Sequence, residues 1–195
     1  FCRRFHPSIA ETRRRLRDGR LGRLISLVGQ QTSGTGPFLP SDNWRSDPEE
    51  SPAGAMTAVG VHLLDHMIEF AGRVRDVHCL VLRAGDGPND DTTNVTLRFE
   101  NGVVASIFCS VSTAPNFSFT VYGTKGLAEI SHTSLQTFRF VPVPDSPPEG
   151  PVTAPPAEVI ESPGFNMLGA ELSAFARSIR EDAPYPVDLE EVLHG

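Results

Sequence analysis

Residues 92–113 carry an alternating pattern of apolar and polar side chains that a turn signal interrupts once. Val95, Leu97 and Phe99 alternate with polar residues, which is the period of a strand with one buried face. Asn101-Gly102 separates this run from the next β-branched run and is typical of a two-residue hairpin turn. An antiparallel hairpin is therefore expected at the centre of the chain.

Other segments extend this hairpin into a larger α+β pattern. Further β-branched runs predict strands over 21–31, 74–83, 117–122, 127–131 and 136–143. Helical periodicity or helix-end signals predict helices over 7–19, 55–72 and 165–181, the last with Leu168, Leu172, Phe175 and Ile179 on one stripe. The Pro-, Glu- and Ser-rich segment 144–164 is expected to be an extended surface connection. Together they predict an open, predominantly antiparallel sheet of about six strands with helices on one face.

The composition argues against several classes of function. The net charge of −7 argues against nucleic acid as a partner, because phosphate neutralisation needs clustered Lys and Arg. The one basic run, Arg13-Arg14-Arg15, is expected to be a solvated helix face. No apolar stretch approaches the roughly 20 residues of a membrane-spanning helix. Three cysteines without CxxC spacing suit a reducing compartment, so a cytoplasmic protein without a membrane partner is expected. Lys125 is the only lysine, so a lysine-dependent mechanism must use it or a residue outside the chain.

The helix predicted over 55–72 carries His62, Asp65 and His66. At helical pitch the two histidines lie one turn apart on the same face. The spacing is similar to the inverted zinc-protease motif, in which two imidazoles bind zinc, although Asp replaces the usual Glu and no third ligand is obvious. The residues alone leave three roles open: zinc ligands of a hydrolase, proton transfer at a substrate, or packing in a core.

Motifs in a fixed order run through nearly the whole chain. Asn43-Trp44-Arg45 is followed by Pro52-Ala-Gly54 and then by Gly60-x-His62-x-x-Asp65. The flanking segments carry further motifs at 4–7, 19–23, 91–102, 121–126, 175–179 and 184–187. In this order they resemble the substrate domain of the Gfo/Idh/MocA oxidoreductases, the family of glucose–fructose oxidoreductase and inositol dehydrogenase.

The resemblance implies a C-terminal domain of the type shared with glyceraldehyde-3-phosphate-dehydrogenase-like proteins. Family members begin with a Rossmann domain that binds NAD or NADP and supplies a catalytic lysine in a Glu-Lys-Pro motif. Residues 1–22 would then be the connection from a missing Rossmann domain, and residues 23–195 the substrate-binding and oligomerisation domain. No residue of this chain is expected to bind the cofactor, and the isolated chain is expected to be inactive.

For the whole protein, the resemblance implies an NAD(P)-dependent oxidoreductase. It would act on a CH–OH group of a sugar, cyclitol or related small molecule. A homodimer or homotetramer formed through the sheet face without helices is expected.

The resemblance also assigns roles to individual residues. His62 keeps the position of the family's histidine and is the candidate catalytic residue, a proton donor or acceptor at the substrate carbinol. Trp44, Arg45 and Asp65 are candidate substrate-binding residues, because a Trp face stacks on a sugar ring and Arg holds a carboxylate or hydroxyl pair. Structural roles for these three, and packing of His66 against the sheet, are the alternatives. No metal ligand is expected.

One position departs from the family pattern. The polyol dehydrogenases of the family carry an aspartate four residues before the histidine, and here that position is Ala58. Without this carboxylate, the orientation of the His62 ring must be fixed in another way. A non-catalytic sugar-binding or dimerisation module is therefore the alternative function.

Overall fold

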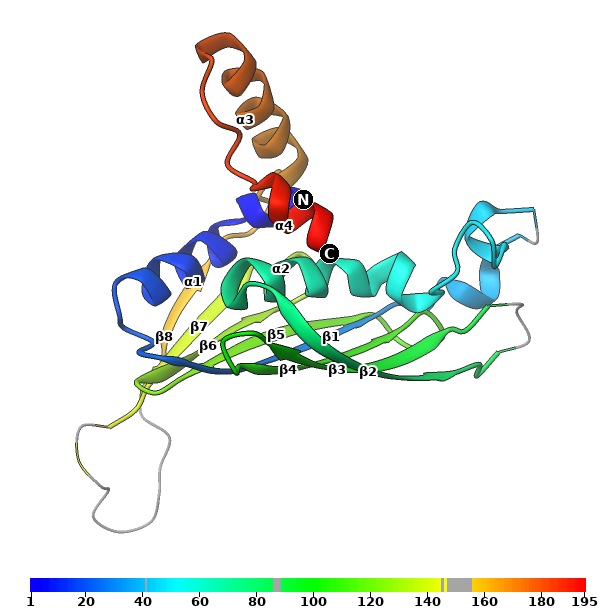
Figure 1. Cartoon of the computed structure of the whole chain (residues 1–195), viewed down its shortest axis with the longest axis horizontal. Coiled ribbons are helices and arrows are strands. Elements are labelled where there is room, and N and C mark those ends of the chain that lie inside the picture. Colours follow the sequence, from blue (N-terminus) through cyan, green and yellow to red (C-terminus); the bar gives the residue numbers. More distant parts are fainter. Residues whose placement is uncertain (41, 86–88, 145, 147–155) are drawn as a thin grey trace. The chain divides into compact units, whose positions relative to one another are not determined.

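A computed structural model describes residues 1–40, 42–85, 89–144, 146 and 156–195. The described residues form an eight-stranded open sheet with the strand order β2-β3-β4-β1-β5-β6-β7-β8 (Figure 1). The strands are β1 Leu24–Thr32, β2 Val74–Leu82, β3 Thr92–Phe99, β4 Val104–Ser110, β5 Asn116–Gly123, β6 Gly126–Ser131, β7 Thr137–Pro142 and β8 Glu158–Glu161. The α-helices are α1 Pro7–Arg17, α2 Val61–Ala71, α3 Met167–Glu181 and α4 Leu189–His194. Short helical turns are η1 Cys2–Phe5, η2 Gly36–Phe38, η3 Trp44–Ser46 and the π-helical η4 Met56–Gly60.

The predicted α+β fold is confirmed, but the predicted number of strands is wrong. The sheet has eight strands rather than about six, and no sequence pattern indicated β8. This strand lies within the segment 144–164 that was expected to be an extended connection. All four of its residues are exposed, so it lacks the alternation that burial of one face imposes. Residues 145 and 147–155 of that segment lie outside the described residues.

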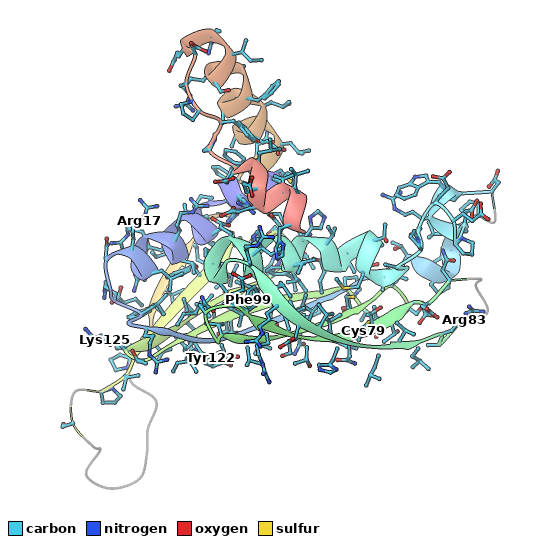
Figure 2. All side chains as sticks on the ribbon, in the orientation of Figure 1. Arg17, Cys79, Arg83, Phe99, Tyr122 and Lys125 are labelled. Atoms are coloured by element: carbon cyan, nitrogen blue, oxygen red, sulfur yellow. The ribbon has the colours of Figure 1, made fainter. Side chains whose placement is uncertain are left out.

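The chain divides into two compact units, which are described separately. One unit contains residues 27–119 and 190–195. In it, β2 pairs with β3 and β3 with β4, both antiparallel, which confirms the predicted central hairpin. Phe99 is buried on the side of the sheet that α2 covers (Figure 2). Leu63 and Met67 of α2 are fully buried, so α2 and the inner face of these strands form the core of this unit.

The other unit contains residues 1–26 and 120–189. Its strands β6, β7 and β8 form an antiparallel ladder, and Lys125 lies in the turn between β5 and β6 (Figure 2). Helix α1 begins after His6, whose ring nitrogen Nδ1 accepts a hydrogen bond from the Ser8 backbone N–H at 3.2 Å. Ile9 of this helix is fully buried and contributes to the core of the unit.

Arg15 of α1 corrects the expectation that the basic run is a solvated face. Its side chain is 2% exposed and donates hydrogen bonds to Glu11 and Glu158, each at 2.7 Å. Its guanidinium lies over the rings of Phe138 and Phe140, with 4.4 Å to the Phe140 centroid. Because each helical residue is rotated by about 100° from the last, three consecutive arginines span about 200° of the helix surface, and Arg15 falls on the side that packs against Phe140.

Helix α3 is confirmed, and its apolar stripe is exposed. Leu168, Leu172, Phe175 and Ile179 are each more than half exposed, although an apolar stripe of this width usually faces a core. None of the helices formed by the described residues combines the length and apolarity needed to cross a bilayer.

Candidate functional site

A pocket of about 810 Å³ opens in the unit that contains residues 27–119. We call it the Arg45 pocket. The segment that follows β1, the η4 turn, the β2–β3 connection and the end of β4 contribute its walls. Polar and apolar side chains both line it, among them Arg45, Ser51, Ala58, Asp90, Asp91 and Ser112. Its volume is within the range of small-molecule sites, which also combine an apolar wall with a few polar groups.

The π-helical turn η4 forms one wall of this pocket. It precedes α2 directly and places Ala58 and Val59 on the pocket surface. Gly60 ends the turn against β4, where a Cβ atom would lie 3.0 Å from the Cys109 sulfur. A side chain at this position would require the Met56 side chain, and to a lesser extent that of Cys109, to shift. Isolated π-helical turns are frequent at functional sites because they change the direction of the residues that follow.

Arg45 lies in the pocket wall on the turn η3. The Asn43 side chain accepts a hydrogen bond from the Arg45 backbone N–H at 3.0 Å, and Asn89 donates one to the Arg45 carbonyl at 2.8 Å. The Arg45 guanidinium lies 4.3 Å from the centroid of the Trp44 ring. Trp44 is half exposed and is not among the described residues that line the pocket. Arg45 thus faces the pocket and covers one face of Trp44.

Asp91 fixes the β2–β3 connection beside the pocket. Its carboxylate accepts hydrogen bonds from the backbone N–H groups of Ala84 and Gly85 at 2.7–3.0 Å, and from the Thr92 hydroxyl at 2.9 Å. Burial by itself raises the pKa of the Asp91 carboxyl, but these donors and the Ser112 hydroxyl outweigh it, and the pKa lies below its ordinary value. Sequence reasoning missed Asp91, although an Asp just before a strand is a known turn signal.

The three polar residues of α2 occupy different surroundings. His62 and Asp65 are half-buried, and neither is among the described residues that line the Arg45 pocket. His62 follows Ala58 by about one helical turn. His66 is fully buried, with its ring 5.7 Å from that of Phe119, and its Nδ1 lies 3.9 Å from a Glu69 carboxylate oxygen. The predicted packing of His66 against the sheet is therefore confirmed, whereas the role of His62 stays a prediction.

Neither a metal site nor a dinucleotide site is built by these residues. Within the described part of the chain, no three His, Cys, Asp or Glu side chains are grouped so that they could hold a metal ion. Gly34 lies between β1 and the three-residue turn η2, and Gly36 is the first residue of that turn. The Gly36 N–H donates a hydrogen bond to the Val111 carbonyl at 2.8 Å. This bond holds the segment that follows β1 against the end of β4. This segment does not fit a pyrophosphate, which takes backbone N–H groups at the start of a longer helix.

Comparison with known proteins agrees with this architecture. Residues 9–129 match the family model of the GFO/IDH/MocA C-terminal domain. The trans-1,2-dihydrobenzene-1,2-diol dehydrogenase of Bos taurus is 27% identical over 128 residues, which cover 65% of this chain and 37% of that enzyme.

Solved structures show the same fold at lower sequence identity. A levoglucosan dehydrogenase in complex with NADH and levoglucosan superposes with a TM-score of 0.81 at 17% identity, over 93% of this chain and 56% of that one. The UDP-N-acetylglucosamine 3-dehydrogenase of Acidithiobacillus ferrooxidans superposes with a TM-score of 0.75 at 19% identity, over 99% of this chain and 56% of that one.

The chain thus spans little more than half the length of these solved relatives. The family model covers more than half of the 195 residues and includes β1 to β5, α2 and the Arg45 pocket. This chain belongs to the GFO/IDH/MocA family, as a representative of its C-terminal domain.

Proposed function

We propose that this chain is the substrate-binding part of an NAD(P)-dependent oxidoreductase that acts on a CH–OH group of a sugar, cyclitol or related small molecule. NAD or NADP would be held by a Rossmann domain elsewhere in the whole protein, since the glycine-containing segment 34–36 does not fit a pyrophosphate. The isolated chain would then be inactive. The observation that carries this proposal is the Arg45 pocket, which lies within the region that matches the family model.

The chemistry of the pocket supports a polyhydroxylated ligand. Arg45 offers several N–H donors, Ser51 and Ser112 offer hydroxyl groups, and Asp90 offers a carboxylate acceptor. Ala58 and Val59 supply an apolar wall against which the C–H face of a sugar ring can pack. Relatives whose names specify levoglucosan and UDP-N-acetylglucosamine as ligand or substrate support the same class.

His62 is the candidate for proton transfer at the substrate carbinol. Oxidation of an alcohol removes a hydride from carbon and a proton from oxygen, and a neutral imidazole accepts that proton at physiological pH. His62 lies on the helix that begins at the pocket wall, about one turn beyond Ala58. A substrate that extends from the Arg45 pocket along α2 toward His62 would place its hydroxyl near the ring. Asp65 follows on the same helix and is proposed to position the substrate or the ring.

A homodimer or homotetramer through the sheet is also proposed. In the unit with residues 27–119, Leu80, Leu82 and Val104 lie on the sheet face opposite α2 and are 77%, 59% and 43% exposed. Sedimentation of the full chain should show an oligomer that Leu80→Asp or Val104→Asp dissociates. Leu168→Asp on α3 serves as the control. A monomer at all concentrations would exclude this assembly for the chain.

The decisive experiment measures turnover of the whole protein with NAD⁺ or NADP⁺ and a panel of sugars and cyclitols. His62→Ala should reduce kcat by about 100-fold or more, the usual contribution of a general base. His132→Ala, an exposed histidine directly after β6, should leave kcat unchanged. Absence of turnover with every substrate, together with unchanged ligand affinity in His62→Ala, would exclude the enzymatic function.

Ala58 favours one alternative function. The position at which the family's polyol dehydrogenases carry an aspartate lies in the wall of the Arg45 pocket, where this chain presents only a methyl group. A non-catalytic sugar-binding or dimerisation module would tolerate that loss. Saturable sugar binding that Arg45→Gln weakens, without turnover by the whole protein, would identify the binding module.

A further inference from the structure

The backbone of Arg45 is held at both of its polar atoms. The Asn43 side chain accepts a hydrogen bond from the Arg45 N–H, and the Asn89 amide donates one to the Arg45 carbonyl at 2.8 Å. Asn43 lies two residues before Arg45, whereas Asn89 lies 44 residues after it, on the β2–β3 connection. The first bond therefore shapes the turn η3 locally, and the second ties that turn to a distant segment.

The turn η3 has little packing to hold it in place. None of its three residues is buried, and Trp44 is 49% exposed. Its remaining hydrogen bonds reach no further along the chain than Pro40 and Asp47. Within the described part of the chain, the Asn89 amide thus donates the one hydrogen bond between η3 and a segment distant in sequence.

Asn89 itself is presented from a fixed base. The carbonyl of the next residue, Asp90, accepts a hydrogen bond from the Ala55 N–H at 3.2 Å. Asp91 follows and is only 8% exposed. Its carbonyl accepts a hydrogen bond from the Val111 N–H at 2.9 Å, directly after β4. An amide that stands on such a base can restrain the more exposed turn that it binds.

We propose that Asn89 is a positioning residue of the Arg45 pocket: its bond to the Arg45 carbonyl fixes η3 and thereby orients the guanidinium for the ligand. The inference rests on the proposed function, because a polyhydroxylated ligand would use that guanidinium as a hydrogen-bond donor. Ordering a long side chain costs free energy that binding must offset, so an arginine that is already oriented binds more tightly. Asn89 acts through Arg45 and needs no contact with the ligand.

The first test needs no ligand. Trp44 is the only tryptophan of the chain, and the Arg45 guanidinium lies 4.3 Å from the centroid of its ring, so its fluorescence reports on η3. In the full chain, Asn89→Ala should increase acrylamide quenching of Trp44 and lower its fluorescence anisotropy. Asn101→Ala is the matched control and should leave both unchanged. The Asn101 amide also donates to a distant carbonyl, that of Ala71 at 2.9 Å, but is not among the described residues that line the pocket.

The second test measures sugar binding in a double-mutant cycle with Arg45→Gln. Levoglucosan and myo-inositol are titrated into the full chain and followed by calorimetry. Asn89→Ala should weaken binding by about three- to tenfold, as loss of one hydrogen bond predicts. In the Arg45→Gln background the same substitution should change affinity by less than about twofold, because Asn89 then has no guanidinium left to position. A merely structural role of Asn89 would weaken binding equally in both backgrounds.

Two results would overturn the inference. One is unchanged fluorescence of Trp44 in Asn89→Ala, and the other is equal weakening of sugar binding by Asn89→Ala with and without Arg45→Gln. Failure of the proposed function gives a different result, because the fluorescence is measured without ligand. If neither sugar binds while Asn89→Ala increases the motion of Trp44, the proposed ligand class is contradicted and the role of Asn89 in fixing η3 is supported.

Discussion

The backbone of Gly54 lies directly against the carbonyl oxygen of Asp90, so closely that no Cβ atom fits between them. Gly54 also adopts a positive φ of 48°, which residues with a side chain rarely adopt. The next residue, Ala55, donates its N–H to the same carbonyl at 3.2 Å. Two chain segments that are far apart in sequence therefore meet at this point in the wall of the Arg45 pocket.

Gly54→Ala should destabilise the protein and disturb the Arg45 pocket. The positive φ costs about 1 kcal/mol, and separation of the two backbones adds about 1–3 kcal/mol. Gly102→Ala is the control, because Gly102 has a positive φ of 85° but open space around it. Urea unfolding of both variants measures the difference. Equal losses would show that the contact with Asp90 contributes nothing.

Asp91→Asn should lower the free energy of unfolding by about 1–3 kcal/mol at neutral pH, because the N–H and hydroxyl groups that donate to Asp91 lose their charged acceptor. The folded protein lowers the pKa of this carboxyl from its ordinary 3.8. The stabilisation is therefore complete above that value and is lost as the pH falls through the folded pKa. Unfolding measured from pH 7 to pH 3 should show the two proteins converging on the acid side. A difference in the free energy of unfolding between the two proteins that stays constant from pH 7 to pH 3 would contradict this role of Asp91.

His6 should make the protein less stable at mildly acidic pH. Burial lowers the pKa of His6 from its ordinary 6.5, so below about pH 6.5 the unfolded chain takes up a proton that the folded chain resists. His6→Asn keeps a side-chain oxygen at the helix N-cap but removes this titration. The loss of stability between pH 7 and pH 5 should be smaller in His6→Asn than in the wild type. The same reduction in the exposed His78→Asn would assign the effect elsewhere.

Arg15→Met should cost about 1–3 kcal/mol of stability, since the charge-assisted hydrogen bonds of a buried guanidinium are lost. The cost stays in this range because Arg14 still pairs with Glu11 and Arg20 with Glu158. Arg15 joins α1 to β8 through Glu158, so the edge strand should show the earliest loss of hydrogen-exchange protection. Arg17→Met is the control, because Arg17 lies on the exposed side of α1 (Figure 2) and should change stability by less than about 0.5 kcal/mol. A similar cost for both variants would exclude the role of the buried network.

Local patterns predicted most of the elements but little of the pocket. The Asn101-Gly102 turn and the alternation of Val95, Leu97 and Phe99 act over a few residues, and the structure has the hairpin that they indicate. Arg15 could not be placed by its neighbours in sequence, because its burial depends on Glu158, which is 143 residues away. The Arg45 pocket likewise depends on contacts between distant loops, so of its lining only Arg45 was predicted to be a substrate-binding residue.

The exposed turn that carries Lys125 has a practical consequence. Its ε-amino group is the only one in the 195 residues, and the Lys125 backbone N–H is bound to the Leu21 carbonyl at 3.0 Å. Within these 195 residues, an amine-directed reagent therefore has a single side-chain target. A fluorophore or cross-linker attached there would report on one defined position between β5 and β6.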